Sequence, residues 1–393
     1  MRRVGLFVGT LALFVVSAQG LQAQRTTFTF GGYVKLDVLS TKYYDGNVAP
    51  ESPLRDIHFP AAIPVGGDND IFSNLDFHAK ESRFNFDVRT RFAEEHEVRA
   101  FVELDFLLAG QGDERVSNSF NPRLRHFFFE YRGWLLGQTW STFMILAPIV
   151  DDLDFGGTAD GFIFNRQPMV RYTTGPWQFA AENPETTLEP FQGGSRIVTE
   201  SSTLPDLVAR YNLSGDWGTL SLAGMVRQLK HEFDTSGTTE ANNALGFGVS
   251  GGGRITVFGR DDVRFQVSAG RGLGRYAAFN YANSAVLDAE QRVTAIPSFL
   301  GFVGYRHLWS ETLRSNVNVS GVIVNNDETL TGTGVNQSAY SFSGNLIYSP
   351  ISALSFGIEL MRAYRRLESG VSGKFDRLQL SGKYDFRFSI GSQ

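Results

Sequence analysis

The stretch 374–388 limits the possible folds most, because its residues alternate between apolar and polar with a period of two. The apolar side chains from residue 378 onward are Leu378, Leu380, Tyr384, Phe386 and Phe388. The intervening odd positions carry Gln, Ser, Lys, Asp and Arg. Successive side chains of a β-strand point to opposite faces, so this segment has one apolar and one charged face. A tilted strand of about 9–11 residues crosses a bilayer, which predicts a transmembrane strand here.

The same alternation recurs along the chain, beginning with the runs 27–39, 77–92 and 97–106. Short turns are predicted near 132–133, 174–176, 214–216, 259–261, 310–311 and 349–350. Long polar connections are predicted near 107–122, 141–165, 184–205, 230–242, 276–294, 325–336 and 367–373. This pattern predicts an all-β fold, a transmembrane antiparallel up-and-down β-barrel of about sixteen strands. An even number of strands places both ends of the chain on the periplasmic side.

Aromatic residues gather at the predicted short turns. They are Phe92, Tyr131, Trp134, Tyr172, Trp177, Tyr211, Trp217, Trp309 and Tyr348. Such amphipathic rings favour the level where hydrocarbon meets water, so they predict the periplasmic aromatic girdle of a barrel. A soluble β-sandwich is the alternative, but its core does not require aromatics at one set of turns.

The composition agrees with a barrel and excludes other classes. Only 42% of the 393 residues are hydrophobic, which is too polar for a bundle of membrane helices but suits strands that are half apolar. The net charge of -5 gives no indication of a nucleic-acid partner. The chain has no cysteine, which fits an oxidising compartment. We expect no cofactor.

The N-terminus has the features of a signal peptide. Arg2 and Arg3 precede an apolar segment at 4–16, and Leu21-Gln22-Ala23 forms a plausible cleavage site. The apolar segment is short for a membrane span, although a membrane anchor is the alternative. We therefore expect residues 1–23 to be removed on export and 24–393 to form the barrel domain. The loss of the two arginines lowers the net charge to about -7.

The connection 141–165 is unusual because an apolar beginning is followed by three acids, which are Asp151, Asp152 and Asp154. A loop that begins Phe-Met-Ile-Leu at 143–146 is unfavourable in open water, so we expect it to fold into the lumen and narrow the pore. The acids are then expected to form one pole of an electric field across the constriction. A calcium site is the alternative, but the spacing matches no EF-hand.

Basic residues are expected to supply the opposite pole. Arg83, Arg89, Arg91 and Arg99 lie on predicted inward faces, and Arg123, Arg125, Arg166 and Arg171 flank the connection 141–165. Arginines around a narrow pore attract anions and bind carboxylates through paired hydrogen bonds. Alternatively, they pair with wall acids, namely Asp37, Glu103, Asp105 and Glu130. The sequence does not decide whether Arg123 and Arg125 face the lumen or the lipid, because both alternate in phase with Phe127 and Phe129.

Signals for catalysis are weak. The chain has six histidines, and those at 96, 126, 231 and 307 fall in different hairpins. It contains no G-x-S-x-G elbow, no H-E-x-x-H motif and no P-loop. The pattern favours a passive diffusion channel for small hydrophilic solutes. An outer-membrane barrel enzyme of the lipase or protease type, or a structural or adhesive barrel, are the alternatives.

The stretch 123–143, RLRHFFFEYRGWLLGQTWSTF, carries a family resemblance together with the segments 32–37, 82–87, 166–172 and 181–186. These segments resemble the DcaP-like porin family of Gram-negative outer membranes, most closely over 30–215. The resemblance implies a homotrimer of sixteen-stranded barrels that admits small anions, notably dicarboxylates. The basic constriction of the family would correspond to Arg83, Arg123, Arg125, Arg166 and Arg171. In such a membrane the chain would contact lipid and lipopolysaccharide.

Two features depart from the family. The last aromatic, Phe388, is followed by five further residues, whereas the final strand of such proteins usually ends the chain. The predicted first strand follows the cleavage site almost directly, so we expect no counterpart of the N-terminal coiled coil of the founding members.

Overall fold

A computed structural model describes residues 25–391, except 94–95, 109–111, 114–116, 200 and 236. The predicted signal peptide, 1–23, lies outside the described residues.

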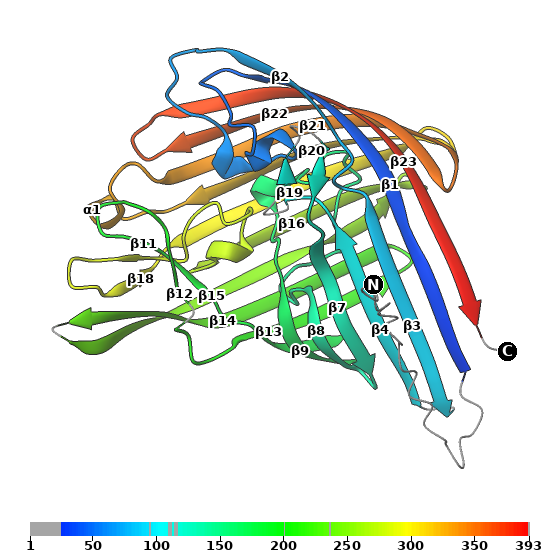
Figure 1. The fold of residues 1–393 in the computed structure, drawn as a ribbon, viewed down its shortest axis with the longest axis horizontal. Helices are drawn as coiled ribbons and strands as arrows, with labels where there is room; N and C mark the ends of the chain where they lie inside the picture. Colours follow the sequence, from blue (N-terminus) through cyan, green and yellow to red (C-terminus); the bar gives the residue numbers. More distant parts are fainter. Residues whose placement is uncertain are drawn as a thin grey trace, which may run out of the picture.

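The described residues form a closed antiparallel barrel of sixteen strands (Figure 1). The first strand, β1 (Arg25–Tyr43), pairs with β2 (Phe72–His78) and β3 (Arg83–Ala93), which are two segments of one barrel strand. The other barrel strands are β4 (His96–Asp105), β7 (Arg123–Tyr131), β8 (Trp134–Trp140), β9 (Arg166–Thr174), β10 (Trp177–Glu182), β13 (Asp206–Gly215), β14 (Gly218–Thr235), β15 (Thr238–Val257), β16 (Asp261–Arg271), β19 (Pro297–Leu308), β20 (Leu313–Val324), β21 (Asn336–Ile351), β22 (Leu354–Leu367) and β23 (Ser372–Gly391). Pairing of β23 with β1 closes the sheet, which confirms the predicted fold class and strand number.

Short elements lie in the long connections. They are the strands β5 (Gly112–Asp113), β6 (Ser119–Phe120), β11 (Thr186–Glu189), β12 (Ile197–Thr199), β17 (Ala285–Leu287) and β18 (Val293–Ala295), the helix α1 (Glu328–Thr331) and the 3-10 turns η1 (Pro53–Arg55), η2 (Pro60–Ala62), η3 (Ala159–Gly161) and η4 (Gly274–Tyr276). Four of these strands form a small sheet in the order β12-β11-β17-β18.

In the part of the chain that the structure describes, no helix is both long enough and apolar enough to cross a membrane.

The alternating residues of each strand place apolar side chains on the outer face of the barrel and polar side chains on its inner face. On β23, Leu380 and Tyr384 are 45% and 52% exposed, whereas Arg377 and Gln379 are each 2% exposed. The exposed apolar side chains face lipid and the buried polar ones face the interior, as the period of two predicts. The predicted girdle residues Trp134, Trp177 and Trp217 are also exposed, and they lie at the short turns.

Two predicted long connections are wrong. At 230–242 the strands β14 and β15 continue as a hairpin, whose last described pair is Thr235↔Thr238. At 367–373 only residues 368–371 separate β22 from β23. Strands that extend beyond the bilayer have water on both faces, so a polar composition there does not mark the end of a strand.

Candidate functional site

The connection between β8 and β9, residues 141–165, lies inside the barrel, and we call it the lumen loop. Phe143 and Met144 belong to the largest cluster of buried apolar residues, together with Leu300 and Phe302 of β19 and Tyr276 of η4. Leu300 and Phe302 alternate with exposed outward neighbours, so this cluster lies on the inner side of the wall. The predicted placement of the apolar segment inside the barrel is confirmed.

The lumen loop is anchored to the opposite wall through its acids. The Nε atom of Arg314 on β20 donates to the Asp151 carboxylate at 2.5 Å. Side-chain amides of Asn316 and Asn345 donate to the backbone carbonyl of Asp151, at 3.0 and 2.9 Å. The Asp152 carboxylate accepts from the amide of Asn318 at 2.8 Å. The loop therefore crosses the lumen and narrows it, since each of these partners belongs to the wall.

Backbone groups of the lumen loop also bind buried charged residues of the wall. The Glu359 carboxylate on β22 accepts the backbone N–H of Leu153 at 2.7 Å and that of Asp154 at 3.1 Å. The Lys35 ammonium on β1 donates to the carbonyl of Leu153 at 2.6 Å and to the carboxylate of Glu81 at 2.5 Å. One turn of loop is thus held from two barrel strands.

Asp154 is the most strongly held of the three predicted acids. It accepts hydrogen bonds from Arg377 Nη1 at 2.8 Å, from the backbone N–H of His58 at 2.8 Å and from that of Gly156 at 2.7 Å. Burial opposes its ionisation, but Arg377 and His58 hold the pKa of Asp154 below its ordinary value. For Asp152, burial and the neighbouring carboxylates of Glu359 and Asp154 raise the pKa well above its ordinary value.

The arrangement of the three acids therefore differs from the sequence-based prediction that they form one pole of an electric field across the constriction. Asp154 is 3% exposed, and its charge is compensated by Arg377. Asp151 has a partly exposed side chain but pairs with Arg314. In this geometry the acids fasten the loop to the wall, because each carboxylate accepts a hydrogen bond from a side chain of a wall strand.

The first long connection, 44–71, also enters the barrel. The buried ring of His58 places Nε2 at 3.4 Å from a carboxylate oxygen of Asp160, and its Nδ1 donates to the carbonyl of Gly157 at 3.1 Å. Burial lowers the pKa of His58, but Asp160, Asp154 and the Gly157 carbonyl outweigh it, so the pKa lies above its ordinary value. The two loops are thus joined through the His58 imidazole.

A group of arginines lies on the wall where the lumen loop begins. The Arg123 guanidinium binds the Asp105 carboxylate through two hydrogen bonds of 2.8 Å. Arg125 donates to Glu103 and to Asp105, each at 2.8 Å, and Arg83 lies 3.6 Å from the same Glu103 carboxylate. These shared partners bring three of the predicted site residues together.

A β-bulge directs Arg123 and Arg125 inward. Between β4 and β7 the register shifts, because Glu103 pairs with His126 while the next residue, Leu104, pairs with Leu124. Arg125 is therefore an extra residue on its strand, and it faces inward together with the following His126. Leu124 and Phe127 both face outward and are exposed. The bulge reconciles inward arginines with outward phenylalanines, which strict alternation does not allow.

Arg166, at the start of β9, completes what we call the arginine cluster (Arg83, Arg123, Arg125 and Arg166). Its guanidinium carbon lies 4.7 Å from the centre of the Trp140 ring, against which Arg125 also lies at 5.5 Å. Within the described ranges Arg166 forms no salt bridge, and its Nη1 is buried without a hydrogen-bond partner. Four guanidinium groups thus face two carboxylates, which leaves two positive charges in surplus.

The other predicted arginines lie elsewhere on the wall. Arg171, five residues along β9 from Arg166, lines a hollow of about 500 Å³ near the short turns, together with Arg99 and Glu130. Five strand residues span about 16 Å, so Arg171 belongs to the periplasmic mouth and not to the cluster. Arg99 binds Asp87 at 2.9 Å and Glu130 at 3.0 Å. The alternative that arginines pair with wall acids therefore applies to Arg99, as it does to Arg83, Arg123 and Arg125.

The sequence did not single out several residues that hold the lumen loop. Lys35 and Arg377 lie on the charged faces of predicted strands, which was the only signal for them. His58 and Glu359 gave no signal, because their partners lie about 100 and 200 residues away in the chain. Their roles depend on the folded loop and not on local sequence.

Comparisons with known proteins agree with this architecture. The sequence model of the DcaP outer membrane protein family matches residues 17–386. The chain resembles the crystal structure of the outer membrane channel DcaP of Acinetobacter baumannii, with a TM-score of 0.74 and 21% identity over 91% of this chain and 97% of that one. Among the curated proteins, no sequence matches this chain.

Two further solved structures share the barrel at lower similarity. The trimer form of OmpT, an outer membrane protein of Vibrio cholerae, has a TM-score of 0.52 and 11% identity over 91% of this chain and 99% of that one. The anion-selective porin from Comamonas acidovorans has a TM-score of 0.50 and 9% identity over 92% and 100%.

Proposed function

Because the chain belongs to the DcaP outer membrane protein family, and is a channel of the porin type in the bacterial outer membrane, we propose that it admits small anions in preference to other solutes. The observation that carries the proposal is the arginine cluster on the wall beside the lumen loop. Its surplus of two positive charges favours anions in a narrow passage. The anion-selective Comamonas acidovorans porin, which has a similar barrel, gives additional support.

We propose dicarboxylates as the preferred class of solute. A guanidinium group binds a carboxylate through two parallel hydrogen bonds, and the uncompensated Arg166 is placed to do so. A solute with two carboxylates matches the two surplus charges of the cluster. Transport is proposed to be passive, so that the solute moves down its concentration gradient without a catalytic step.

Swelling of liposomes that contain the purified protein tests this preference. Succinate is expected to enter faster than a neutral sugar of similar size. Equal or slower entry of succinate would contradict the proposed selectivity, and absence of entry of either solute would contradict a diffusion channel.

We also propose that the protein works as a homotrimer, in line with the family resemblance and with the trimeric OmpT. Native mass spectrometry of detergent-extracted protein is expected to give three times the protomer mass. A mass of one protomer under conditions that preserve channel activity would contradict the trimer and leave the selectivity proposal unaffected.

A further inference from the structure

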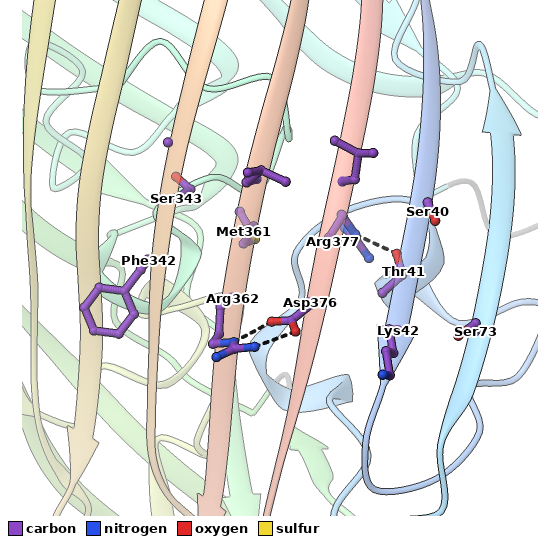
Figure 2. A pocket seen from close by; sticks show the side chains of 13 residues that line it. Ser40, Thr41, Lys42, Ser73, Phe342, Ser343, Met361, Arg362, Asp376 and Arg377 are labelled. Atoms are coloured by element: carbon purple, nitrogen blue, oxygen red, sulfur yellow. Dashed lines mark hydrogen bonds and ion pairs between the residues drawn. The ribbon is translucent and has the colours of Figure 1, made fainter.

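The outer face of the barrel carries charged residues at the end where the long loops lie. Arg362 of β22 is paired in register with Asp376 of β23, which is paired in turn with Lys42 of β1. Lys374 lies two residues from Asp376, on the same face of β23. We call these four residues the outer-rim cluster, of which Figure 2 shows Lys42, Arg362 and Asp376. Lys42 and Arg362 are exposed. The residues that flank each of them along its strand point into the barrel and are buried.

The outer-rim cluster has a surplus of positive charge. Arg362 binds Asp376 through hydrogen bonds of 2.5 and 2.6 Å, and the Tyr44 hydroxyl donates to the same carboxylate at 2.7 Å. The ammonium groups of Lys42 and Lys374 lie 4.9 and 5.0 Å from the Tyr44 ring centre. No carboxylate among the described residues forms a salt bridge with either lysine. Three cations and one anion leave two positive charges, although the chain as a whole is acidic.

An apolar groove runs below the outer-rim cluster, away from the loops. The next outward row across the strands consists of Gly344, Leu360, Leu378 and Ser40, which are neighbours in register. The small side chains at Gly344 and Ser40 leave a hollow of about 600 Å³, bordered by exposed Leu360 and Leu378. Figure 2 shows the ionic row directly beside this hollow.

The position of the groove relative to the membrane follows from the fold. Long loops mark the extracellular end of a barrel, and aromatic residues mark the headgroup level. Tyr340 and Tyr364, whose stacked rings are 4.6 Å apart, lie in the next row toward the loops, beside Lys374. The outer-rim cluster therefore lies at the headgroups of the outer leaflet, and the groove lies at the level of the acyl chains.

We propose that this groove binds one phosphate-bearing anionic lipid of the outer leaflet, a lipopolysaccharide. Lys42, Arg362 and Lys374 would bind a lipid phosphate, and an acyl chain would fill the hollow beside Gly344. Charge complementarity selects this occupant, because juxtamembrane lysines and arginines attract anionic headgroups and a neutral lipid gains nothing from them. The proposal depends on the location in the outer membrane and not on which solute the channel carries.

Native mass spectrometry of the purified protein with added lipid A tests the proposal. The probe is lipid A that carries both phosphates, compared with the dephosphorylated molecule. Wild-type protein is expected to bind the phosphorylated form and not the other. The double variant Lys42→Gln/Lys374→Gln is expected to bind at least about tenfold more weakly, since each cation near a charged surface contributes to attraction. Lys383→Gln, which removes a charge on the lumen face of the same strand, is the matched control.

A second variant tests the acyl part of the site. A Cβ at Gly344 meets Val317 Cγ1 at 3.5 Å, an ordinary contact, so Gly344→Leu is expected to fold and to fill the groove. It should also weaken binding of phosphorylated lipid A. Unchanged binding by both variants, or equal binding of the dephosphorylated lipid, would overturn the proposal. Complete competition by inorganic phosphate would also overturn it.

Discussion

The guanidinium of Arg166 lies 4.7 Å from the centre of the Trp140 ring, and in the described part of the chain no carboxylate forms a salt bridge with it. The ring holds the charged group at the wall without neutralising it. Its three companions in the arginine cluster all contact Glu103 or Asp105. Arg166 is thus the member of the cluster whose charge no carboxylate among the described residues compensates through a salt bridge.

Removal of this charge should reduce anion preference. A unit charge about 7 Å from a solute, in a passage of effective dielectric constant about 40, contributes on the order of 1 kcal/mol, or about fivefold in selectivity. Arg166→Gln is therefore expected to lower the ratio of succinate to sugar permeability by about this factor. Arg260→Gln, at the exposed turn between β15 and β16, should leave the ratio unchanged. An unchanged permeability ratio in Arg166→Gln would show that Arg166 does not line the constriction.

Asp105 should be important for stability. It is fully buried and receives hydrogen bonds from Arg123 and Arg125. Breaking a buried pair from one side leaves a charge without compensation, at a cost of at least about 3 kcal/mol. Asp105→Asn should lower the free energy of unfolding in urea by this amount. Glu311→Gln, at an exposed turn, should change it by less than about 0.5 kcal/mol. Equal effects of the two changes would show that the pairs contribute nothing.

Close packing of the lumen loop against the wall should depend on Gly161. A Cβ at this position would lie 2.1 Å from the backbone carbonyl of Gly301 on β19. Gly161→Ala should therefore push the loop into the passage, lower single-channel conductance and cost roughly 1–3 kcal/mol of stability. Gly334→Ala is the control, because nothing lies within 4 Å of a Cβ there. Wild-type conductance in Gly161→Ala would mean that the loop does not limit flow.

The contact between His58 and Asp160 should depend on pH. The pKa of His58 is raised in the fold, so its stabilising contribution is full below the unfolded pKa of about 6.5 and is lost as pH rises through the folded pKa. Hydrogen exchange of residues 156–163, corrected for intrinsic rates, should therefore accelerate as the pH rises above about 6.5. His58→Gln should remove this dependence. A pH response that persists in the variant would assign it to other groups, such as Asp152.

The sequence predicts the barrel well because the pattern that specifies a barrel strand is local. Alternation on each strand, as from Leu378 to Phe388, decides which face meets lipid, and this needs no knowledge of the rest of the chain. The hairpin at 230–242 was missed because polar residues on both faces resemble a loop. The sequence does not predict which face Arg125 occupies. A single extra residue moves all later side chains of a strand to the opposite face, and this residue is recognised only from the pairing of β7 with β4.

The contacts of the lumen loop are less predictable. The sequence predicts Asp154 as part of one pole of an electric field across the constriction, but Arg377 and His58, both distant in sequence, bind its carboxylate. Charge and spacing indicate that such an acid has a partner, yet they do not identify which residue the fold brings near. Of the five arginines predicted for the constriction, four lie in one cluster and Arg171 lies apart, and their role in the constriction stays a prediction.

The zero-current potential of the purified protein in a planar bilayer, under a gradient of potassium chloride, tests the central claim most directly. The account predicts a potential of the sign that chloride permeation produces, reduced in Arg166→Gln. A potential of the opposite sign, or one near zero from protein that conducts, would contradict an anion-selecting arginine cluster.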